Sequence, residues 1–539
     1  MPPRLPGGGP SRPFASYPGR GGFAKGESHA LPSPARSLPT QLLQRLLRTG
    51  SGGERIILCK SALRAISSGR PEPLRWRGHY RPQYSRKGVA RNGGQAQTSE
   101  NGHWPGPMIS AKFHARLLAQ ALKQYRCRRL VVSPGSRNAP LIASLSADPD
   151  YEIYSVPDER AAAFTAMGMG LEKGEPAAIL CTSGSAAANY LPAITEAYYQ
   201  KVPLVVLTAD RPLELIGQGH GQTIQQVGIY GQHVLASASL PRETHDALAR
   251  NATLRLVHQT LQKAHRGPVH LNLPFQEPLY EAHQGPAEDF RRIVKPQPEA
   301  SLTRESLEEL VDIWTSAEKV MVLCGQMPPW PEFDQILREL FAKRPFLLLS
   351  ETLSNRRGVP GIASIDRFLR PLSREAREAW RPDLLITCGG EVISKMIKAH
   401  LHDHPPRWHW HLEESDLLKD TFQALTHHLP LAPLRFFQQM LPLLPAAESS
   451  WTQSCLDLER KRQLDHQSIV AQAPASDLQA YSQVLASLPD RCILHCANSA
   501  SIRYAQLFDQ LPGIDHYANR GTSGIDGSTS TAIGHASVV

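Results

Sequence analysis

The 539-residue chain has no long apolar run. It contains no stretch of about 18 apolar residues, which excludes a transmembrane helix predicted from hydropathy. Its amino-terminus also lacks the continuous apolar segment of a secretory signal peptide. The eight cysteines are scattered, and Cys492 and Cys496 have no second pair at zinc-binding spacing. We therefore predict reduced, structural thiols in a cytoplasmic protein.

Several signatures of known chemistry are missing as well. The chain has no P-loop, no GxGxxG fingerprint, no GxSxG elbow and no HExxH motif. The segment HLHDHPPRWHWH, residues 400–411, is rich in histidine. Its alternating spacing favours an exposed loop and strand face over a metal site.

Acidic residues are scarce at the amino-terminus. Residues 1–107 contain 14 Arg and 3 Lys against 4 Glu and no Asp, a net charge of +13, whereas the whole chain has +10. Their Gly-, Pro- and Ser-rich composition predicts a disordered basic leader, in which only TQLLQRLLRT and ERIILCKSALRAI could form short helices. The leader could be unstructured or spurious before a true start at Met108, an organelle transit peptide, or a nucleic-acid-binding arm. We expect no nucleic-acid partner for the rest of the chain, because the basic excess lies in the leader.

From Met108 onward, apolar runs alternate with helical patterns. Continuous apolar strands separated by helices predict an α/β fold with parallel sheets covered on both faces. The predicted units are a first α/β domain over residues 108–285, a central α/β domain over residues 300–440 and an incomplete third domain over residues 475–539. Ligands of such sheets bind beyond the carboxyl ends of the strands, so the turns there are the places to search.

Four turns of the first domain follow predicted strands: SPGSRN, PDER, TSGS and TADRP. The TSGS turn, which contains Ser183, opens a helix whose amide groups could hold an anion, although any strand-to-helix turn looks similar. Arg137 in SPGSRN is well placed for a carboxylate. The alternative for Arg137 is a solvated loop arginine.

The PDER turn has a structural interpretation of its own. Pro157 fits the first turn of a helix, and the acids Asp158 and Glu159 complement the positive end of the helix dipole. Ala162, Ala166 and Gly170 recur at four-residue spacing and would leave a smooth face for another helix. The local pattern therefore leaves open whether either acid takes part in chemistry.

Six strings occur in order along the chain: SPGSRNAPL, PDERAAAF, CTSGSAAANYLPAITEA, LTADRPLELIGQGHGQTIQQ, GPVHLNLPFQEPLY and NRGTSGIDG. Together they resemble the thiamine-diphosphate-dependent 2-succinyl-5-enolpyruvyl-6-hydroxy-3-cyclohexene-1-carboxylate synthases of menaquinone synthesis. The resemblance covers residues 108–539. It implies a pyrimidine-binding, a central and a diphosphate-binding domain, in homodimers or homotetramers with cofactor sites between subunits.

The resemblance implies decarboxylation of 2-oxoglutarate and addition of the succinyl-semialdehyde carbanion to isochorismate, with thiamine diphosphate and Mg²⁺ (or Mn²⁺) as cofactors. Glu159 matches the family's catalytic glutamate, which hydrogen-bonds the aminopyrimidine ring and favours its imino form. Ile525 matches the bulky residue that holds the cofactor bent. The expected substrate-binding residues are Ser136, Arg137, Arg211, Gln222 and Lys395. The expected cofactor-binding residues are Glu159, Ser183, Asn519, Ser523, Gly524 and Ile525, within a motif that also contains Arg520 and Asp526.

The chain departs from the family pattern at two places. Many members have Asn where this chain has Gly221, so His220 compensates or a contact is lost. Members also continue into a Gly-Asp and a later Asn that bind Mg²⁺ and diphosphate; we expect that motif beyond Val539 and no metal ligands before it. The sequence thus predicts a carboxyl-truncated member. The alternatives are an inactive fragment that acts at most as a binding or assembly partner, and another thiamine-dependent 2-oxo acid carboligase.

Overall fold

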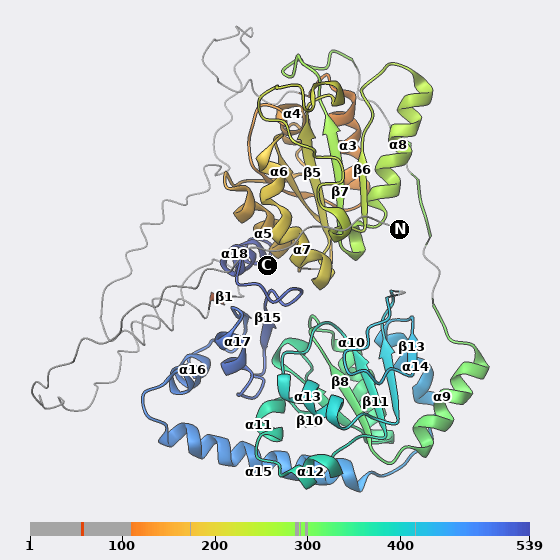
Figure 1. Ribbon diagram of the computed structural model, residues 1–539, viewed down its shortest axis with the longest axis vertical. Helices are drawn as coiled ribbons and strands as arrows, with labels where there is room; N and C mark the ends of the chain where they lie inside the picture. The colour runs from red at the N-terminus through yellow and green to blue at the C-terminus, as the bar shows by residue number, and fades with distance from the viewer. Residues whose placement is uncertain are drawn as a thin grey trace, which may run out of the picture. The chain divides into compact units, whose positions relative to one another are not determined.

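The computed structural model describes residues 55–58, 109–172, 174–285, 290–291, 293–296, 300–415 and 417–539. These residues form three parallel β-sheets with helices packed around them (Figure 1). The predicted α/β class is confirmed. No helix in the described ranges is both long enough and apolar enough to cross a membrane.

The first sheet has six parallel strands in the order β3-β2-β4-β5-β7-β6. Its strands are β2 (Arg129–Val132), β3 (Glu152–Ser155), β4 (Ala177–Cys181), β5 (Leu204–Asp210), β6 (Ala236–Ser239) and β7 (Pro268–Pro274). Its helices are α3 (Phe113–Gln124), α4 (Ala139–Ser146), α5 (Glu159–Gly170), α6 (Ser185–Asn189), α7 (Leu191–Gln200) and α8 (Ala247–Leu261).

Both faces of this sheet are buried, as β4 illustrates. Its side chains alternate between the faces because a strand has a two-residue repeat. Leu180 belongs to a core shared with α3, α4 and α8, whereas Ile179 belongs to a second core shared with α5, α6 and α7. Helices cover both faces of the sheet, so functional side chains can gather only at its edges. In such folds they gather at the carboxyl ends of the strands.

The second sheet has six strands in the order β10-β9-β8-β11-β12-β13. Its strands are β8 (Val320–Cys324), β9 (Leu347–Ser350), β10 (Gly361–Ile362), β11 (Leu384–Cys388), β12 (Trp408–Leu412) and β13 (His427–Leu429). Its helices are α9 (Arg304–Ser316), α10 (Pro331–Lys343), α11 (Ile365–Leu369), α12 (Arg374–Ala379), α13 (Lys395–Asp403) and α14 (Pro433–Leu443).

The third sheet has three parallel strands in the order β1-β14-β15. Its strands are β1 (Arg55–Leu58), β14 (Cys492–His495) and β15 (Ile514–Tyr517). The helices after the central sheet are α15 (Ser450–Gln472), α16 (Asp477–Ala486), α17 (Ala500–Ala505) and α18 (Ser528–Ala536). Helix α15 is the long blue helix of Figure 1.

Strand β1 corrects one expectation about the leader. The segment ERIILCKSALRAI was one of two that could form a short helix, but its residues Arg55–Leu58 pair with β14 as a parallel strand. Its two adjacent isoleucines favour a strand because β-branched side chains fit a pleated surface. The rest of the predicted leader, TQLLQRLLRT and Met108 lie outside the described residues.

The histidine-rich segment is also buried where exposure was expected. His409 and His411 lie on β12, and Thr387 Oγ1 on β11 is 2.9 Å from His409 Nε2 and 2.8 Å from His411 Nδ1. Burial lowers the pKa of both histidines to about 4. His400 on α13 is buried as well. The expectation of an exposed face is therefore wrong for the strand, whose histidines are buried, whereas His402 and Asp403 at the end of α13 and the loop residues Pro405 and Arg407 are exposed as expected.

Candidate active site

Helix α5 begins after β3 and carries Glu159 as its first residue. Asp158 is the N-cap, and its Oδ1 accepts a hydrogen bond from Ala161 N at 2.7 Å, which confirms its role as a helix-start acid. The prediction that Pro157 lies in the first turn is wrong, because the helix begins two residues later. Glu159 is half-buried, and its charge adds to burial in raising the pKa of the Cys181 thiol at the end of β4. Glu159 therefore lies near the turn that follows β4.

That turn consists of Thr182, Ser183 and Gly184, and it leads into α6. The hydroxyl oxygens of Thr182 and Ser183 are buried and have no hydrogen-bond partner among the described residues. Gly184 has φ +86°, and its amide donates to Gln226 Oε1 at 2.8 Å. Buried hydroxyls without partners are costly, so the turn has the capacity to bind a polar ligand.

The turn after β2 packs against the same place. A Cβ on Gly135 would lie 2.5 Å from Thr182 Cβ, so the two turns are in contact. Arg137 is 5% exposed and donates to Phe275 O at 2.9 Å and to Glu277 Oε1 at 3.1 Å. The alternative of a solvated loop arginine is therefore wrong. Ser136, next to it, is exposed.

The turn after β5 brings a second arginine to this edge. Arg211 Nε donates to Gly221 O at 2.9 Å. Burial lowers the pKa of Arg137, and the charge of Arg211 lowers it further, so the two guanidinium groups are neighbours. Gln222 has φ +61°, and its Cγ would lie 3.1 Å from a Cβ on Gly184. The turns that carry Ser136, Arg137, Ser183, Arg211 and Gln222 thus meet at one edge of the first sheet.

The loop 519–526, which follows β15 of the third sheet, is fixed by asparagines. Asn519 is 3% exposed and donates through Nδ2 to Asp526 O and Thr531 Oγ1, both at 3.2 Å. Asn498 donates through Nδ2 to Asn519 O and to Gly524 O, both at 2.5 Å. These bonds curve the loop back toward α17, with Ser523 at φ +59°.

Ile525 lies on this loop and is 73% exposed. A bulky apolar side chain in that position gains free energy when a ligand or another chain covers it. Its exposure is consistent with the expected contact to a cofactor.

Glu196 on α7 joins this loop to the first domain. Its carboxylate accepts hydrogen bonds from Gly521 N at 2.6 Å, Thr522 N at 2.8 Å and Thr522 Oγ1 at 2.6 Å. Helix α18 also lies against α5 in the same chain, and Arg160 Nη1 is 3.6 Å from Asp526 Oδ1. The helix of Glu159 and the loop of Ile525 are therefore neighbours within one chain.

Lys395 is the first residue of α13, and its side chain is exposed. Among the described residues it forms no hydrogen bond or ion pair, so no such bond joins it to the turns at the edge of the first sheet. Its neighbour Met396 lines a cavity of about 1000 Å³ between α11, α13, α15 and α17. The predicted residue therefore lies beside this cavity rather than at the edge of the first sheet.

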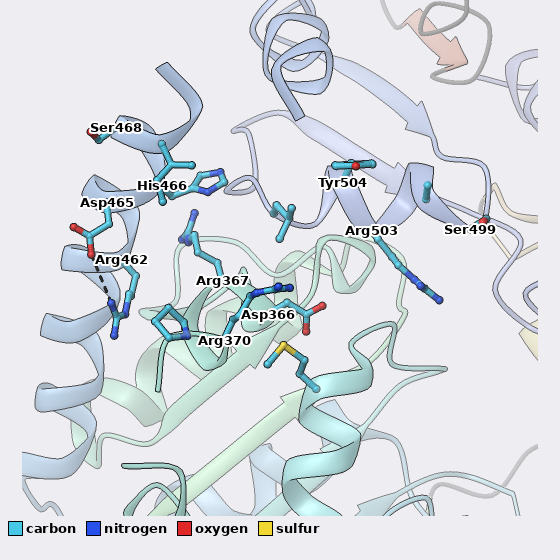
Figure 2. A pocket seen from close by; sticks show the side chains of 15 residues that line it. Asp366, Arg367, Arg370, Arg462, Asp465, His466, Ser468, Ser499, Arg503 and Tyr504 are labelled. Atoms are coloured by element: carbon cyan, nitrogen blue, oxygen red, sulfur yellow. Dashed lines mark ion pairs between the residues drawn. The ribbon is translucent and has the colours of Figure 1, made fainter. Parts of the chain in front are cut away.

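Figure 2 shows this cavity, with Arg503 and Tyr504 on α17 and Arg462, Asp465 and His466 on α15. Arg462 pairs with Asp465 at 3.6 Å. In the part of the chain that the structure describes, the guanidinium groups of Arg370 and Arg503 have no hydrogen bond or ion pair. The charge of Arg503 also lowers the pKa of Arg520, after the larger effect of burial. The cavity is therefore basic and adjoins the loop 519–526.

Two residues of this cavity, Ser499 and Arg503, could have been predicted as site residues from the sequence. Ser499 and Arg503 in NSASIR follow a predicted strand, as Ser136 and Arg137 do in SPGSRN. Glu196 and Gln226 had no such signal, since their partners are distant in sequence.

Comparison with known proteins gives a consistent result. Residues 114–229 match the family model described as "Thiamine pyrophosphate enzyme, N-terminal TPP binding domain". The chain is similar to three curated proteins named 2-succinyl-5-enolpyruvyl-6-hydroxy-3-cyclohexene-1-carboxylate synthase. The protein of Flavobacterium johnsoniae is 38% identical over 420 residues, which cover 76% of this chain and 73% of the relative. Those of Porphyromonas gingivalis and Bacteroides fragilis are 39% and 38% identical over 445 and 439 residues, with 80% of this chain and 76% and 77% of the relatives covered.

Proposed function

This chain belongs to the 2-succinyl-5-enolpyruvyl-6-hydroxy-3-cyclohexene-1-carboxylate synthase family, and we propose that it decarboxylates 2-oxoglutarate and adds the remaining four-carbon unit to isochorismate. Its thiamine pyrophosphate enzyme domain makes it a thiamine-diphosphate-dependent carboligase. The proposal concerns the two substrates and the residues that bind them.

The turn after β4 carries the proposal. The hydroxyls of Thr182 and Ser183 have no hydrogen-bond partner among the described residues, and they directly follow Cys181, whose pKa the charge of Glu159 raises. A turn with these groups suits the polar edge of an aminopyrimidine ring. When bound, thiamine diphosphate supplies a nucleophilic carbon and an electron sink for the loss of CO₂. The carboxyl group of Glu159 would hold the proton at the ring, and Ile525 would pack against the cofactor.

Three further expected contacts belong to the proposal: Asn519, Ser523 and Gly524 on the loop toward the cofactor. Asn519 and Gly524 are tied to that loop by hydrogen bonds through Asn498. A loop fixed in this way can present its backbone to a ligand without further ordering.

The substrates are anions, so the proposal requires cationic groups. Arg137 and Arg211 supply two of them at the edge of the first sheet, with Ser136 and Gln222 beside them. Arg370 and Arg503 in the cavity of Figure 2 are two more, and Lys395 stands next to that cavity. Arginine forms paired hydrogen bonds with carboxylates, which supports binding of a dicarboxylate here.

Gly221 contacts Arg211 through its backbone. Its carbonyl oxygen accepts from Arg211, while His220 is exposed. Because a backbone carbonyl makes this contact, it does not depend on the side chain at position 221, and the expectation that His220 compensates or a contact is lost stays a prediction.

The metal, the assembly and the location stay predictions. Within the described ranges, no group of three or more His, Cys, Asp or Glu residues could hold a metal ion. We therefore assign no step to Mg²⁺ or Mn²⁺. A homodimer or homotetramer and a cytoplasmic location remain expectations from the family.

A substrate panel tests the proposal. The chain is incubated with thiamine diphosphate, Mg²⁺ and one of several 2-oxo acids, with or without isochorismate, and CO₂ and the coupled product are measured. We expect coupled product only with 2-oxoglutarate and isochorismate together. Product from a different 2-oxo acid would assign another carboligase, and failure to bind thiamine diphosphate in calorimetry would favour the inactive fragment.

A further inference from the structure

A buried carboxylate lies outside the residues described so far. Glu351 follows β9 and is 1% exposed. Its Oε2 accepts a hydrogen bond from Ile393 N at 2.5 Å, and its Oε1 accepts from Ser394 N at 2.6 Å and from Gln506 Nε2 at 2.8 Å. It has no ion pair with any described residue. The carboxylate is therefore satisfied by three N–H donors from distant parts of the chain.

These bonds are part of a closed ring. Ser394 is the N-cap of α13, and its hydroxyl donates to Asp366 on α11. Ser364, the N-cap of α11, donates through Oγ to Gln506 O at 2.8 Å. Gln506 is the C-cap of α17, and the hydrogen bond from its Nε2 to Glu351 Oε1 closes the ring. One carboxylate thus connects the starts of α11 and α13 to the end of α17.

The same three helices form the walls of the cavity in Figure 2. Asp366 and Arg367 come from α11, Met396 from α13, and Arg503 and Tyr504 from α17. The ring therefore ties three walls of the cavity to one carboxylate.

Burial makes an ionised carboxylate expensive at this position. It raises the pKa of Glu351, while the hydrogen bonds from Ile393, Ser394 and Gln506 oppose the rise. A residue needed only for packing could be apolar at lower cost. The feature that requires a carboxylate is its pair of oxygens, since each accepts a backbone N–H and a glutamine side chain offers only one oxygen.

We propose that Glu351 is a positioning residue, which sets the distance between the start of α13, beside Lys395, and α17, which carries Arg503. This inference rests on the proposed function in one respect: it takes the cavity to receive an anionic part of a substrate. Glu351 touches neither substrate nor cofactor and acts through these two helices.

The test compares Glu351→Gln, Glu351→Asp and a control, Asp334→Asn, in the full chain. Asp334 on α10 is also a buried carboxylate near the central sheet. Its Oδ1 is 2.9 Å from Arg356 Nη1, and it is not a member of the ring. Hydrogen exchange is measured by mass spectrometry for peptides 391–398 and 500–507. The Michaelis constant for 2-oxoglutarate and kcat are measured in parallel.

We expect exchange in both peptides to be about tenfold faster in Glu351→Gln, with Glu351→Asp in between and Asp334→Asn unchanged there. The Michaelis constant should rise about tenfold in Glu351→Gln, with a smaller change in kcat. Unchanged exchange in both peptides, or an effect equal to that of Asp334→Asn, would overturn the proposal. If the unmodified chain does not turn over 2-oxoglutarate, the proposed function fails, and the exchange measurement still decides the role of Glu351.

Discussion

Arginines in this protein divide into those that are paired and those that are available to a ligand. Arg137 is buried and bonded to Phe275 O and Glu277, whereas Arg370 and Arg503 have no partner among the described residues. A guanidinium held near a second cation without a counterion is unfavourable until an anion arrives. The unpaired arginines are therefore the better candidates for direct contact with substrate carboxylates.

Replacing Arg503 tests this distinction at the level of one residue. Arg503→Ala should raise the Michaelis constant for 2-oxoglutarate by at least about tenfold, because a charge-assisted hydrogen bond contributes roughly 1.5 kcal/mol or more. Arg462→Ala is the matched control, since Arg462 lines the same cavity but pairs with Asp465. Equal Michaelis constants for the two variants in steady-state assays would exclude a special role for Arg503.

At the scale of helices, the contact between α5 and α18 shows what a sequence pattern can predict, which is that another helix packs there, and what it cannot, which is the residues in contact. A small-residue face on α5 was expected to receive another helix, and α18 does pack there. The close backbone contacts, however, involve Thr165 and Gly168 rather than the predicted Gly170. A Cβ on Gly168 would lie 2.0 Å from Thr531 O, and a Cβ on Gly534 of α18 would lie 1.8 Å from Thr165 O, whereas a Cβ on Gly170 would lie 2.5 Å from Pro203 O, just before β5. Four-residue spacing identifies small residues but not which of them faces which neighbour.

Gly168→Ala should therefore destabilise the protein by about 1–3 kcal/mol, because the added methyl overlaps backbone that cannot move aside. Gly221→Ala is the control, since a Cβ at Gly221 meets nothing within 4 Å. Denaturant unfolding of both variants measures the difference. A free energy of unfolding for Gly168→Ala equal to that of Gly221→Ala would contradict the close helix contact.

The apolar strands of the sheets were predictable, and the short polar ones were not. Strands such as β4 and β8 are continuous apolar runs, which periodicity detects. Strand β6 (ASAS) has no large apolar side chain, and β12 (WHWHL) alternates aromatics with histidines that look polar in sequence. The edge position of β6 and the Thr387 partner of the β12 histidines depend on tertiary pairing, which no local pattern reports.

The candidate site divides in the same way. The turns that carry Arg137, Glu159 and Ser183 follow strands, so their place at one edge could be predicted from the fold class. Glu196 and Glu351 could not be found in this way. Their donors lie 325 and 42 residues along the chain, respectively, and neither acid has a local motif.

For the molecule as a whole, buried histidines set the response to acid. Burial lowers the pKa of His114, His270 and His495 from 6.5 to about 3. Below pH 6.5 the unfolded chain binds protons that the native state does not, so the free energy of unfolding falls as pH falls from 6.5 toward 3. Each such histidine contributes about 1.4 kcal/mol per pH unit in this window. Glu459 acts in the opposite direction, since burial raises its pKa to about 7 and favours the native state as pH falls below that value.

Denaturant unfolding between pH 7.5 and pH 5 checks this account. We expect a net fall in the free energy of unfolding toward the acid end, because three buried histidines lower it and Glu459 raises it. His495→Gln removes one titrating group, so the number of protons taken up on unfolding should fall by up to about one. The slope of the free energy of unfolding against pH should become smaller to match. A pH dependence that is the same in the unmodified chain and in His495→Gln would contradict the prediction.

The account depends most on Glu159, the acid that begins α5 near the end of β4, where the hydroxyls of the following turn have no hydrogen-bond partner among the described residues. The most direct measurement is the rate of CO₂ release from 2-oxoglutarate, with thiamine diphosphate, Mg²⁺ and isochorismate, by the unmodified chain and by Glu159→Gln. Glutamine keeps the shape of the side chain but cannot take up the proton, so we expect the rate to fall by at least about a hundredfold. Thermal unfolding serves as the control that the variant is folded. A rate in Glu159→Gln equal to that of the unmodified chain would contradict the assignment of this residue to the cofactor.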